Sequence, residues 1–186
     1  MKANEAQAVA GVVLSEGPEL NVNPPGTPPG QGEPGGASKY GVSVDALTDY
    51  HRALGKPAAT VADVAALTEA GAITFYTEWV MPKLRFDELP SGVDYRAFDV
   101  FTNLGTSGGI DLLELAVGRF PPLGKFDDHL LAAVKAIDPR AMVLMIGAQW
   151  ITKKRTQPGW IKSGHGWSNR RTRVDAQALS MVEAGS

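Results

Sequence analysis

One carboxylate in this sequence stands where a general acid could be held. Glu16 follows the mostly apolar run from Ala8 to Leu14 and precedes the stretch from Gly17 to Gly36, in which 12 of 20 residues are Gly or Pro. A helix is expected to end at Glu16, because glycine and proline stop helices. An apolar wall disfavours the charged form of a carboxyl, and a general acid must keep its proton. Glu16 is therefore a candidate general acid, and its alternative is a structural residue at a helix end.

A second acidic residue, Glu33, lies toward the far end of the same loop, and the segment G-G-A-S-K-Y-G-V-S from Gly35 to Ser43 follows it. Glycoside hydrolysis needs one group that protonates the leaving oxygen and a second that stabilises, attacks or delivers water to the oxocarbenium-like transition state. Glu33 is the candidate for this second group. Its alternative is a solvated charge on a loop.

Several other chemistries find little support in the sequence. It has no cysteine, which excludes disulfides, zinc-thiolate sites, iron–sulfur clusters and thiol nucleophiles. His51, His129 and His165 are far apart and lack ligand spacing, so we expect no metal and no cofactor. Residues 30–35 fit G-x-G-x-x-G and residues 105–109 fit G-x-S-x-G, but both motifs need a strand before the turn, and the chain shows no βαβ alternation.

The elements that position the candidate residues are predicted to be helices. Ser43 and Thr68 are candidate N-caps, and Thr60 with Asp63 fits a capping box. Hydrophobic periodicity, capping residues and Gly/Pro turns predict helices over residues 5–15, 44–54, 68–79, 91–104, 110–117, 127–137, 139–152 and 168–182, with a short one after Thr60. Strand evidence is thin, so the expected fold class is mainly α.

Charge is distributed unevenly along the chain. Residues 1–150 carry 11 basic and 18 acidic side chains, whereas residues 151–186 carry 7 and 2. All seven of these bases lie between Lys153 and Arg173, interleaved with Trp160 and Trp167, a pattern suited to anionic polymers. The alternative is an ordinary solvated helix surface.

The candidate residues carry a resemblance to a known family. Val13 to Gly17 resembles an opening motif in which a helix ends in Glu-Gly-Gly, although Pro18 replaces the second glycine here. The segment E-P-G-G-A-S-K-Y-G-V-S from Glu33 to Ser43 is similar to D-P-G-G-x-T-N-Y-G-I-T. Both motifs are found in the phage and prophage N-acetylmuramidases of glycoside hydrolase family 108, which includes proteins first described as secretion activators.

Later landmarks extend this resemblance over about residues 8–174. Glu78-Trp79, Leu89-Pro90 and residues 98–105 resemble the family's Y-W, L-P and F-D-x-x-V-N-S-G motifs. Residues 124–127 and 166–170 resemble, more loosely, the peptidoglycan-binding region that accompanies the family. The resemblance implies a lysozyme-like helical domain with a long Gly/Pro-rich active-site loop over residues 1–105, and a helical peptidoglycan-binding part over residues 106–186, packed together as one compact unit.

The resemblance also implies roles for individual residues. Glu16 would be the catalytic acid, Glu33 the second carboxylate and Ser43 the residue that positions a water molecule; capping of the next helix is the alternative role for Ser43, and the two roles are compatible. The loop before Glu33 is longer than the family usually has, so Asn23 is a rival position for the second group. Residues expected to contact the sugar are Tyr40, Trp79 and Asn103, for which packing roles are equally open.

The expected function is that of a lysozyme-type endolysin that cuts peptidoglycan between N-acetylmuramic acid and N-acetylglucosamine. The alternatives are a lytic transglycosylase and a catalytically silent wall-binding or secretion-accessory protein. Expected partners are peptidoglycan strands and a separate holin, with no nucleic acid, no stable membrane insertion and a monomeric state. The run from Ala8 to Leu14 is too short for a bilayer span or a signal peptide, so we expect the host cytoplasm until release and action in the periplasm.

Overall fold

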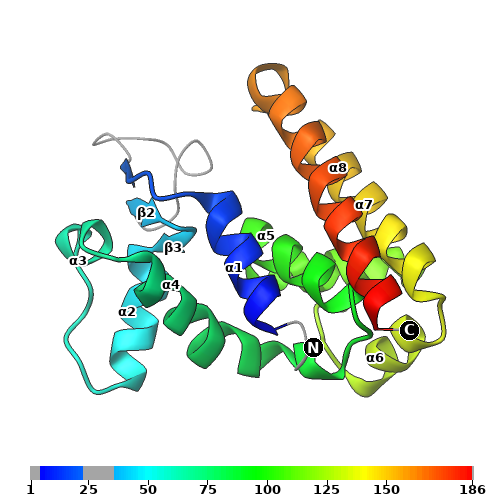
Figure 1. The fold of residues 1–186 in the computed structure, drawn as a ribbon, viewed down its shortest axis with the longest axis horizontal. Coiled ribbons are helices and arrows are strands. Elements are labelled where there is room, and N and C mark those ends of the chain that lie inside the picture. The colour runs from blue at the N-terminus through cyan, green and yellow to red at the C-terminus, as the bar shows by residue number, and fades with distance from the viewer. Residues whose placement is uncertain (1–4, 23–35, 186) are drawn as a thin grey trace. The chain divides into compact units, whose positions relative to one another are not determined.

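Helices make up most of the structure, so the fold is mainly α, as the sequence predicted (Figure 1). The computed structural model describes residues 5–22 and 36–185. The described residues form two compact units, one of residues 9–84 and one of residues 85–185 together with residues 5–8. The expected boundary after residue 105 separates a catalytic region from a peptidoglycan-binding region. This division by function stays a prediction.

Helix α1 and a small antiparallel sheet begin the Val9–Leu84 unit. Helix α1 (Glu5–Glu16) ends at the predicted residue. The sheet has the order β1-β2-β3, with β1 (Asn21–Val22) on its edge beside β2 (Ala37–Lys39), and β2 beside β3 (Val42–Ser43). This sheet is not predicted from the sequence, because strands of two or three residues are too short to show an alternating pattern.

Three short helices follow the sheet, and each begins at its predicted cap. Helix α2 (Val44–Ala53) is capped by Ser43, whose hydroxyl accepts from the amide of Ala46. Helix α3 (Val61–Ala65) has the Thr60–Asp63 capping box, and α4 (Glu69–Phe75) is capped by Thr68. These polar side chains satisfy amides that a helix start leaves without partners.

The chain does not continue from α4 as a regular α-helix. The π-helix η1 (Tyr76–Val80) follows at once, and the 3-10 helix η2 (Met81–Leu84) comes next. A π-helical turn changes the direction of the side chains relative to an α-helix, and such turns are frequent at functional sites. The helix predicted over residues 68–79 is therefore present, but its second half is π-helical and not α-helical.

The second unit begins with the 3-10 helix η3 (Phe86–Glu88), followed by α5 (Val93–Ala116), α6 (Asp128–Lys135), α7 (Pro139–Arg155) and α8 (Trp160–Ala184). The two helices predicted over residues 91–104 and 110–117 are joined as α5, which is interrupted at Gly105 with φ 71° and ψ 173°. Helices α7 and α8 lie side by side, joined by a short turn (Figure 1).

Helix α8 begins eight residues before the predicted start at residue 168. Two glycines, Gly164 and Gly166, weaken the helical signal there, because glycine is a poor helix former. In the structure the missing side chain at Gly164 makes room for Trp160, since a β-carbon built on Gly164 would lie 2.9 Å from the Trp160 ring. Gly164 therefore weakens the prediction of the helix from sequence, but in the structure it lets the Trp160 ring pack against the helix backbone.

A buried ionic network joins α5 to α8. The guanidinium of Arg96 donates to Asp175 at 2.7 Å and to Asp99 at 3.0 Å. Asp99 also accepts from Arg170 at 2.8 Å, and Asp175 accepts from Arg171 at 2.7 Å. Burial raises the pKa of the Asp175 carboxyl, although the neighbouring Arg96 and Arg171 oppose this shift. Each carboxylate is therefore paired with two arginines inside the protein, as a buried charge requires.

Candidate active site

Glu16 ends α1 in a half-buried position. Gly17, with φ +77°, turns the chain away from the helix, and its amide donates to the carbonyl of Val13 at 3.1 Å. The carbonyl of Gly17 then accepts from the amide of Tyr40 at 3.0 Å. This hydrogen bond ties the end of α1 to the β2–β3 hairpin, although the two lie more than 20 residues apart in the chain.

The hairpin turn consists of Tyr40 and Gly41, between the paired residues Lys39 and Val42. Both turn residues have positive φ, 53° for Tyr40 and 76° for Gly41, as two-residue type I′ hairpins require. A tyrosine in this conformation is uncommon and is held there by its surroundings. Its carbonyl accepts from the Tyr76 hydroxyl at 3.0 Å, and its amide is bound to Gly17.

Gly41 brings the turn against Glu16. A β-carbon built on Gly41 would lie 2.8 Å from Cγ and 3.3 Å from Cδ of Glu16, and 2.6 Å from the hydroxyl oxygen of Tyr76. Distances under 3.0 Å are not tolerated by real β-carbons, so only glycine allows this approach. The Glu16 side chain, the Tyr76 hydroxyl and the turn backbone therefore meet at one place.

Tyr76 is a site residue that the sequence analysis missed. It begins η1 directly after α4, and its side chain is only 3% exposed. A buried hydroxyl needs a hydrogen-bond partner, which here is the carbonyl of Tyr40, 36 residues away. No local pattern in the sequence announces such a long-range bond, although the resemblance had drawn attention to Glu78 and Trp79 nearby.

Trp79 lies in an aromatic cluster behind this contact. Its ring is 5.8 Å from that of Tyr50, which is 5.5 Å from the ring of Phe75, and Phe75 is 5.4 Å from Tyr76. The Tyr50 hydroxyl donates to Glu78 at 2.9 Å, and burial together with this carboxylate raises the pKa of Tyr50. Trp79 is therefore connected to Tyr76 through packed rings, and it is half-buried.

Ser43 and Lys39 occupy structural positions at the hairpin. The Ser43 hydroxyl accepts from the Ala46 amide at 3.2 Å, which confirms the capping role that was one of the two readings of this residue. The Lys39 ammonium donates to the carbonyl of Ala65 at 2.8 Å and so joins the hairpin to the end of α3. Lys39 stands where the family motif has Asn, and this contact gives the lysine a packing role.

The other predicted residues lie either outside the described part of the chain or in the other unit. Glu33, its rival Asn23 and the G-x-G-x-x-G segment over residues 30–35 lie outside the described residues. Asn103 lies half-buried on α5, in the unit of Arg85–Ser186. The structure thus brings Glu16 and Tyr40 together, adds Tyr76, and places Ser43 and Trp79 in the same unit.

The basic segment is partly structural, which neither sequence interpretation anticipated. Arg170 and Arg171 bind the buried carboxylates Asp99 and Asp175. The ammonium of Lys154 lies 5.6 Å from the ring centre of Trp150 and 4.8 Å from that of Trp167, and the residue is only 7% exposed. These three cations contribute to packing inside their unit.

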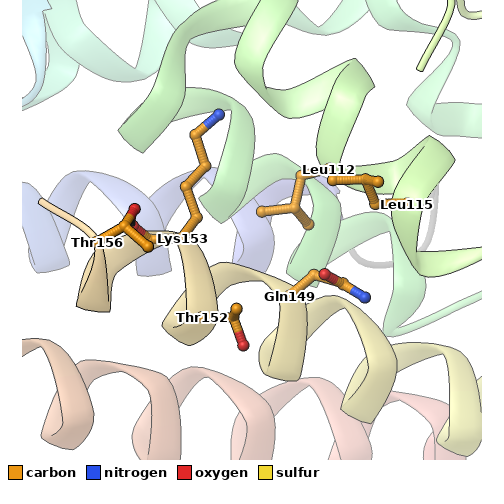
Figure 2. Close-up of a pocket in the computed structure, with 6 residues that line it drawn as sticks. All are labelled: Leu112, Leu115, Gln149, Thr152, Lys153 and Thr156. Atoms are coloured by element: carbon orange, nitrogen blue, oxygen red, sulfur yellow. Dashed lines mark hydrogen bonds between the residues drawn. The ribbon is translucent and has the colours of Figure 1, made fainter. Parts of the chain in front are cut away.

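A pocket of about 250 Å³ lies between α5 and α7, within the unit of Arg85–Ser186 (Figure 2). Its lining residues are Leu112, Leu115, Gln149, Thr152, Lys153 and Thr156. None of these six is a carboxylate, and none was predicted as a site residue. Leu112, which is buried, and Leu115 form the apolar side of this pocket.

Neither a metal cluster nor a membrane span is found in the part of the chain that the structure describes. Among residues 5–22 and 36–185, no three His, Cys, Asp or Glu side chains are grouped to hold a metal ion. In the same residues, no helix has both the length and the apolar character needed to cross a bilayer.

Comparison with known proteins supports a glycoside hydrolase. The family model of glycosyl hydrolase 108 matches residues 26–105, which include Tyr40, Ser43, Trp79 and Asn103 and begin ten residues after Glu16. Among solved structures, the chain is similar to SagA of Brucella abortus, with 26% sequence identity, a TM-score of 0.79 and coverage of 98% of this chain and 97% of that one. No curated protein sequence matches the chain. The mainly α, lysozyme-like fold and a glycoside hydrolase of the family 108 type are therefore both supported.

Proposed function

We propose that this protein is an N-acetylmuramidase that cleaves peptidoglycan between N-acetylmuramic acid and N-acetylglucosamine, with Glu16 as the general acid. The observation that carries the proposal is the packing of Glu16 against the glycine turn, inside a chain that matches a glycoside hydrolase family. Catalytic carboxyls must be held in one geometry by rigid neighbours. The helix end, the Gly41 turn and Tyr76 supply this support for Glu16.

In the proposed mechanism, Glu16 protonates the glycosidic oxygen as the bond to the leaving sugar breaks. The positive charge that develops on the remaining sugar ring needs a second group, which is a carboxylate, a nucleophile or an oriented water. Glu33 is proposed for this role. Ser43 is proposed to hold the water, because a serine hydroxyl that accepts one hydrogen bond still has one donor and one acceptor site.

Sugar contacts are proposed for Tyr40, Trp79 and Asn103. Tyr40 and Trp79 are half-buried, so each ring keeps a surface that a sugar can stack on. The Asn103 amide offers both a donor and an acceptor for an N-acetyl or hydroxyl group. These roles rest on the family motif and not on a bound ligand.

The first test compares the wild type with Glu16→Gln on purified bacterial sacculi and on outer-membrane-permeabilised cells. We expect the variant to lose clearing by at least 100-fold, because Gln cannot donate the proton. Glu19→Gln is the matched control, since it removes an exposed carboxylate three residues away. Equal activity of Glu16→Gln and wild type would remove Glu16 from the mechanism.

The products of the same digestion distinguish the alternatives. Fragments with reducing-end muramic acid indicate a muramidase, whereas anhydro-muramic acid indicates a lytic transglycosylase. Binding to sacculi without release of any fragment, by wild type and variant alike, indicates a silent wall-binding or secretion-accessory protein. A parallel Glu33→Gln variant tests the second carboxylate, and wild-type activity in this variant would contradict its role.

We also propose the biological setting that the resemblance implies. The protein acts as a monomeric phage-type endolysin, is held in the host cytoplasm until a separate holin opens the membrane, and then acts on the wall in the periplasm. Residues 1–105 would cut the glycan, and residues 106–186 would bind it. Host lysis that requires co-expression of a holin would support this setting, and lysis by the protein alone would contradict it.

A further inference from the structure

The α7–α8 hairpin carries no negative charge over most of its length. Residues 139–174 contain no Asp or Glu, but they contain eight Lys and Arg side chains. Asp138 and Asp175 are the acids that flank this stretch, and Asp175 is bound to Arg96 and Arg171. A long helical surface of one sign attracts a partner of the opposite sign.

Not all of these cations face outward. Arg170 and Arg171 are engaged with buried carboxylates, and Lys154 lies between two indole rings. Arg140, at the start of α7, donates to Glu183 at 2.5 Å. The structure thus pairs or covers these four of the eight basic side chains.

The cations at the turn between α7 and α8 are exposed and are not among the four just described. Arg155 ends α7 and Lys162 follows the start of α8, and both side chains are exposed. The Arg155 guanidinium lies 5.7 Å from the ring centre of Trp160. Between them Ile161 is 98% exposed, so its whole aliphatic side chain is available to a partner. The turn therefore presents an isoleucine and part of an indole between two cations.

Packing makes this turn a fixed surface. The Trp160 and Trp167 rings lie 6.1 Å apart. A β-carbon built on Gly159 would be 3.1 Å from the Trp167 ring, and one on Gly164 would be 2.9 Å from the Trp160 ring. Because the two indoles fill the space over the two glycines, Ile161 is held outward on an ordered helical turn.

We propose that this turn, formed by Arg155, Trp160, Ile161 and Lys162 and called here the basic tip, docks the protein peripherally on a bilayer containing anionic phospholipid. Such surfaces combine cations that attract the headgroups with apolar and indole side chains that enter the boundary with the acyl chains. A polysaccharide or a nucleic acid would use the cations but would leave Ile161 exposed to water. The inference goes beyond the proposed hydrolysis and does not depend on it.

The test uses the full chain with vesicles of pure phosphatidylcholine or of phosphatidylcholine with 30% phosphatidylglycerol. We expect co-sedimentation with the anionic vesicles, weakened by salt, and little with the neutral ones. Lys162→Gln and Arg155→Gln should each lower the partition constant by about fivefold, and Ile161→Ser by about tenfold. Lys56→Gln, an exposed change of the same charge on the other unit, should leave the partition constant unchanged.

A second measurement locates the contact. Because the sequence has no cysteine, Ile161→Cys carries a single site for an environment-sensitive fluorophore. Its emission should shift to the blue with anionic vesicles. The matched control is Leu144→Cys, on α7 at a position that is 46% exposed and about 16 Å from the end of that helix at 1.5 Å per residue. Equal shifts at both positions would contradict docking through the tip.

The same variants give different results if the basic tip binds something other than an anionic bilayer. Absence of binding to anionic vesicles overturns the proposal, as does equal binding by wild type and tip variants. If the tip variants instead lose binding to purified sacculi, the surface is a wall contact. If Ile161→Ser converts a dimer into a monomer in sedimentation velocity, the occupant is a second copy of the chain. In each case activity on sacculi reports separately on Glu16, so failure of the tip and failure of the proposed hydrolysis remain distinguishable.

Discussion

The side chain of Glu16 packs directly against the α-carbon of Gly41. The contact joins the last residue of α1 to a hairpin turn that has positive φ at both of its central residues. Glycine is required at position 41 for two reasons. Its φ is +76°, and a β-carbon there would come within 2.8 Å of Glu16 Cγ. The backbone of one element thereby fixes the carboxyl that another element presents.

The first prediction concerns Gly41→Ala. The added methyl group must displace Glu16 or Tyr76, and a displacement of about 1 Å at a catalytic group can cost about 100-fold in rate. We therefore expect hydrolysis of sacculi to fall by about that factor, measured as the initial rate of clearing, while the circular dichroism spectrum stays that of a folded helical protein.

Gly55→Ala provides the matched control for this change. Gly55 also has positive φ, +70°, but nothing lies within 4 Å of a β-carbon built there. Both variants carry the same backbone strain, of about 1 kcal/mol, and only Gly41→Ala disturbs Glu16. Equal loss of activity in the two variants would show that stability, and not the contact with Glu16, limits the enzyme.

The second prediction concerns Tyr76→Phe, which removes one hydroxyl and keeps the ring. The carbonyl of Tyr40 then loses a buried donor at 3.0 Å, so we expect a loss of about 1 kcal/mol in the free energy of unfolding. Activity should fall more than this loss of stability explains, because the turn that supports Glu16 is loosened. Tyr50→Phe is the control, because it removes only the hydrogen bond to the exposed Glu78, and it should retain activity. If Tyr50→Phe loses more activity than Tyr76→Phe, Tyr76 does not belong to the site.

Local signals predicted those parts of the site that depend on neighbours in the chain. Glu16 was placed at a helix end because Gly17 and Pro18 follow it, and the Thr60–Asp63 box was read from its spacing alone. Such features involve contacts within four residues, where side-chain chemistry and backbone geometry determine each other. The resemblance contributed the hairpin segment, but not its conformation.

Long-range contacts could not be predicted in the same way. The Tyr76 hydroxyl bonds to a residue 36 positions away, and the Arg170 guanidinium bonds to one 71 positions away. In the sequence Arg170 belonged to a basic stretch that favoured an anionic partner, whereas in the fold it neutralises Asp99. Tertiary packing determines which residues form such long-range pairs, and the hydrophobic periodicity of the sequence does not predict them.

The third prediction concerns the buried network of Arg96. In Arg96→Met, the volume of the side chain is largely kept, but Asp99 and Asp175 each lose one of their two arginine partners. Removing one member of a buried ionic group costs about 3–5 kcal/mol in the free energy of unfolding. Urea unfolding measures this loss. Arg52→Met, which breaks an exposed pair with Asp49, should change the midpoint little, and a similarly small effect at Arg96 would contradict the importance of the network.

The last prediction concerns Glu114, a fully buried carboxylate on α5. It accepts from Arg119 at 2.8 Å and from the amides of Leu123 and Gly124 at 2.7 and 2.8 Å. Burial opposes its charge, but these donors outweigh burial and hold the pKa of the Glu114 carboxyl below its ordinary value of 4.5. Glu114 therefore organises the loop after α5 as a charged group.

A carboxyl whose pKa is lower in the folded than in the unfolded state stabilises the fold above pH 4.5, and this contribution is lost as the pH falls through the folded value. At pH 7, Glu114→Gln should therefore lower the free energy of unfolding by about 2 kcal/mol, because an amide cannot accept all three bonds with the same strength. The gap between wild type and variant should narrow steadily below pH 4.5. Thermal unfolding from pH 7 to pH 3 measures this gap, with Glu183→Gln, an exposed change, as the control. A gap that is constant over the whole range would mean that the charge of Glu114 does not stabilise the loop.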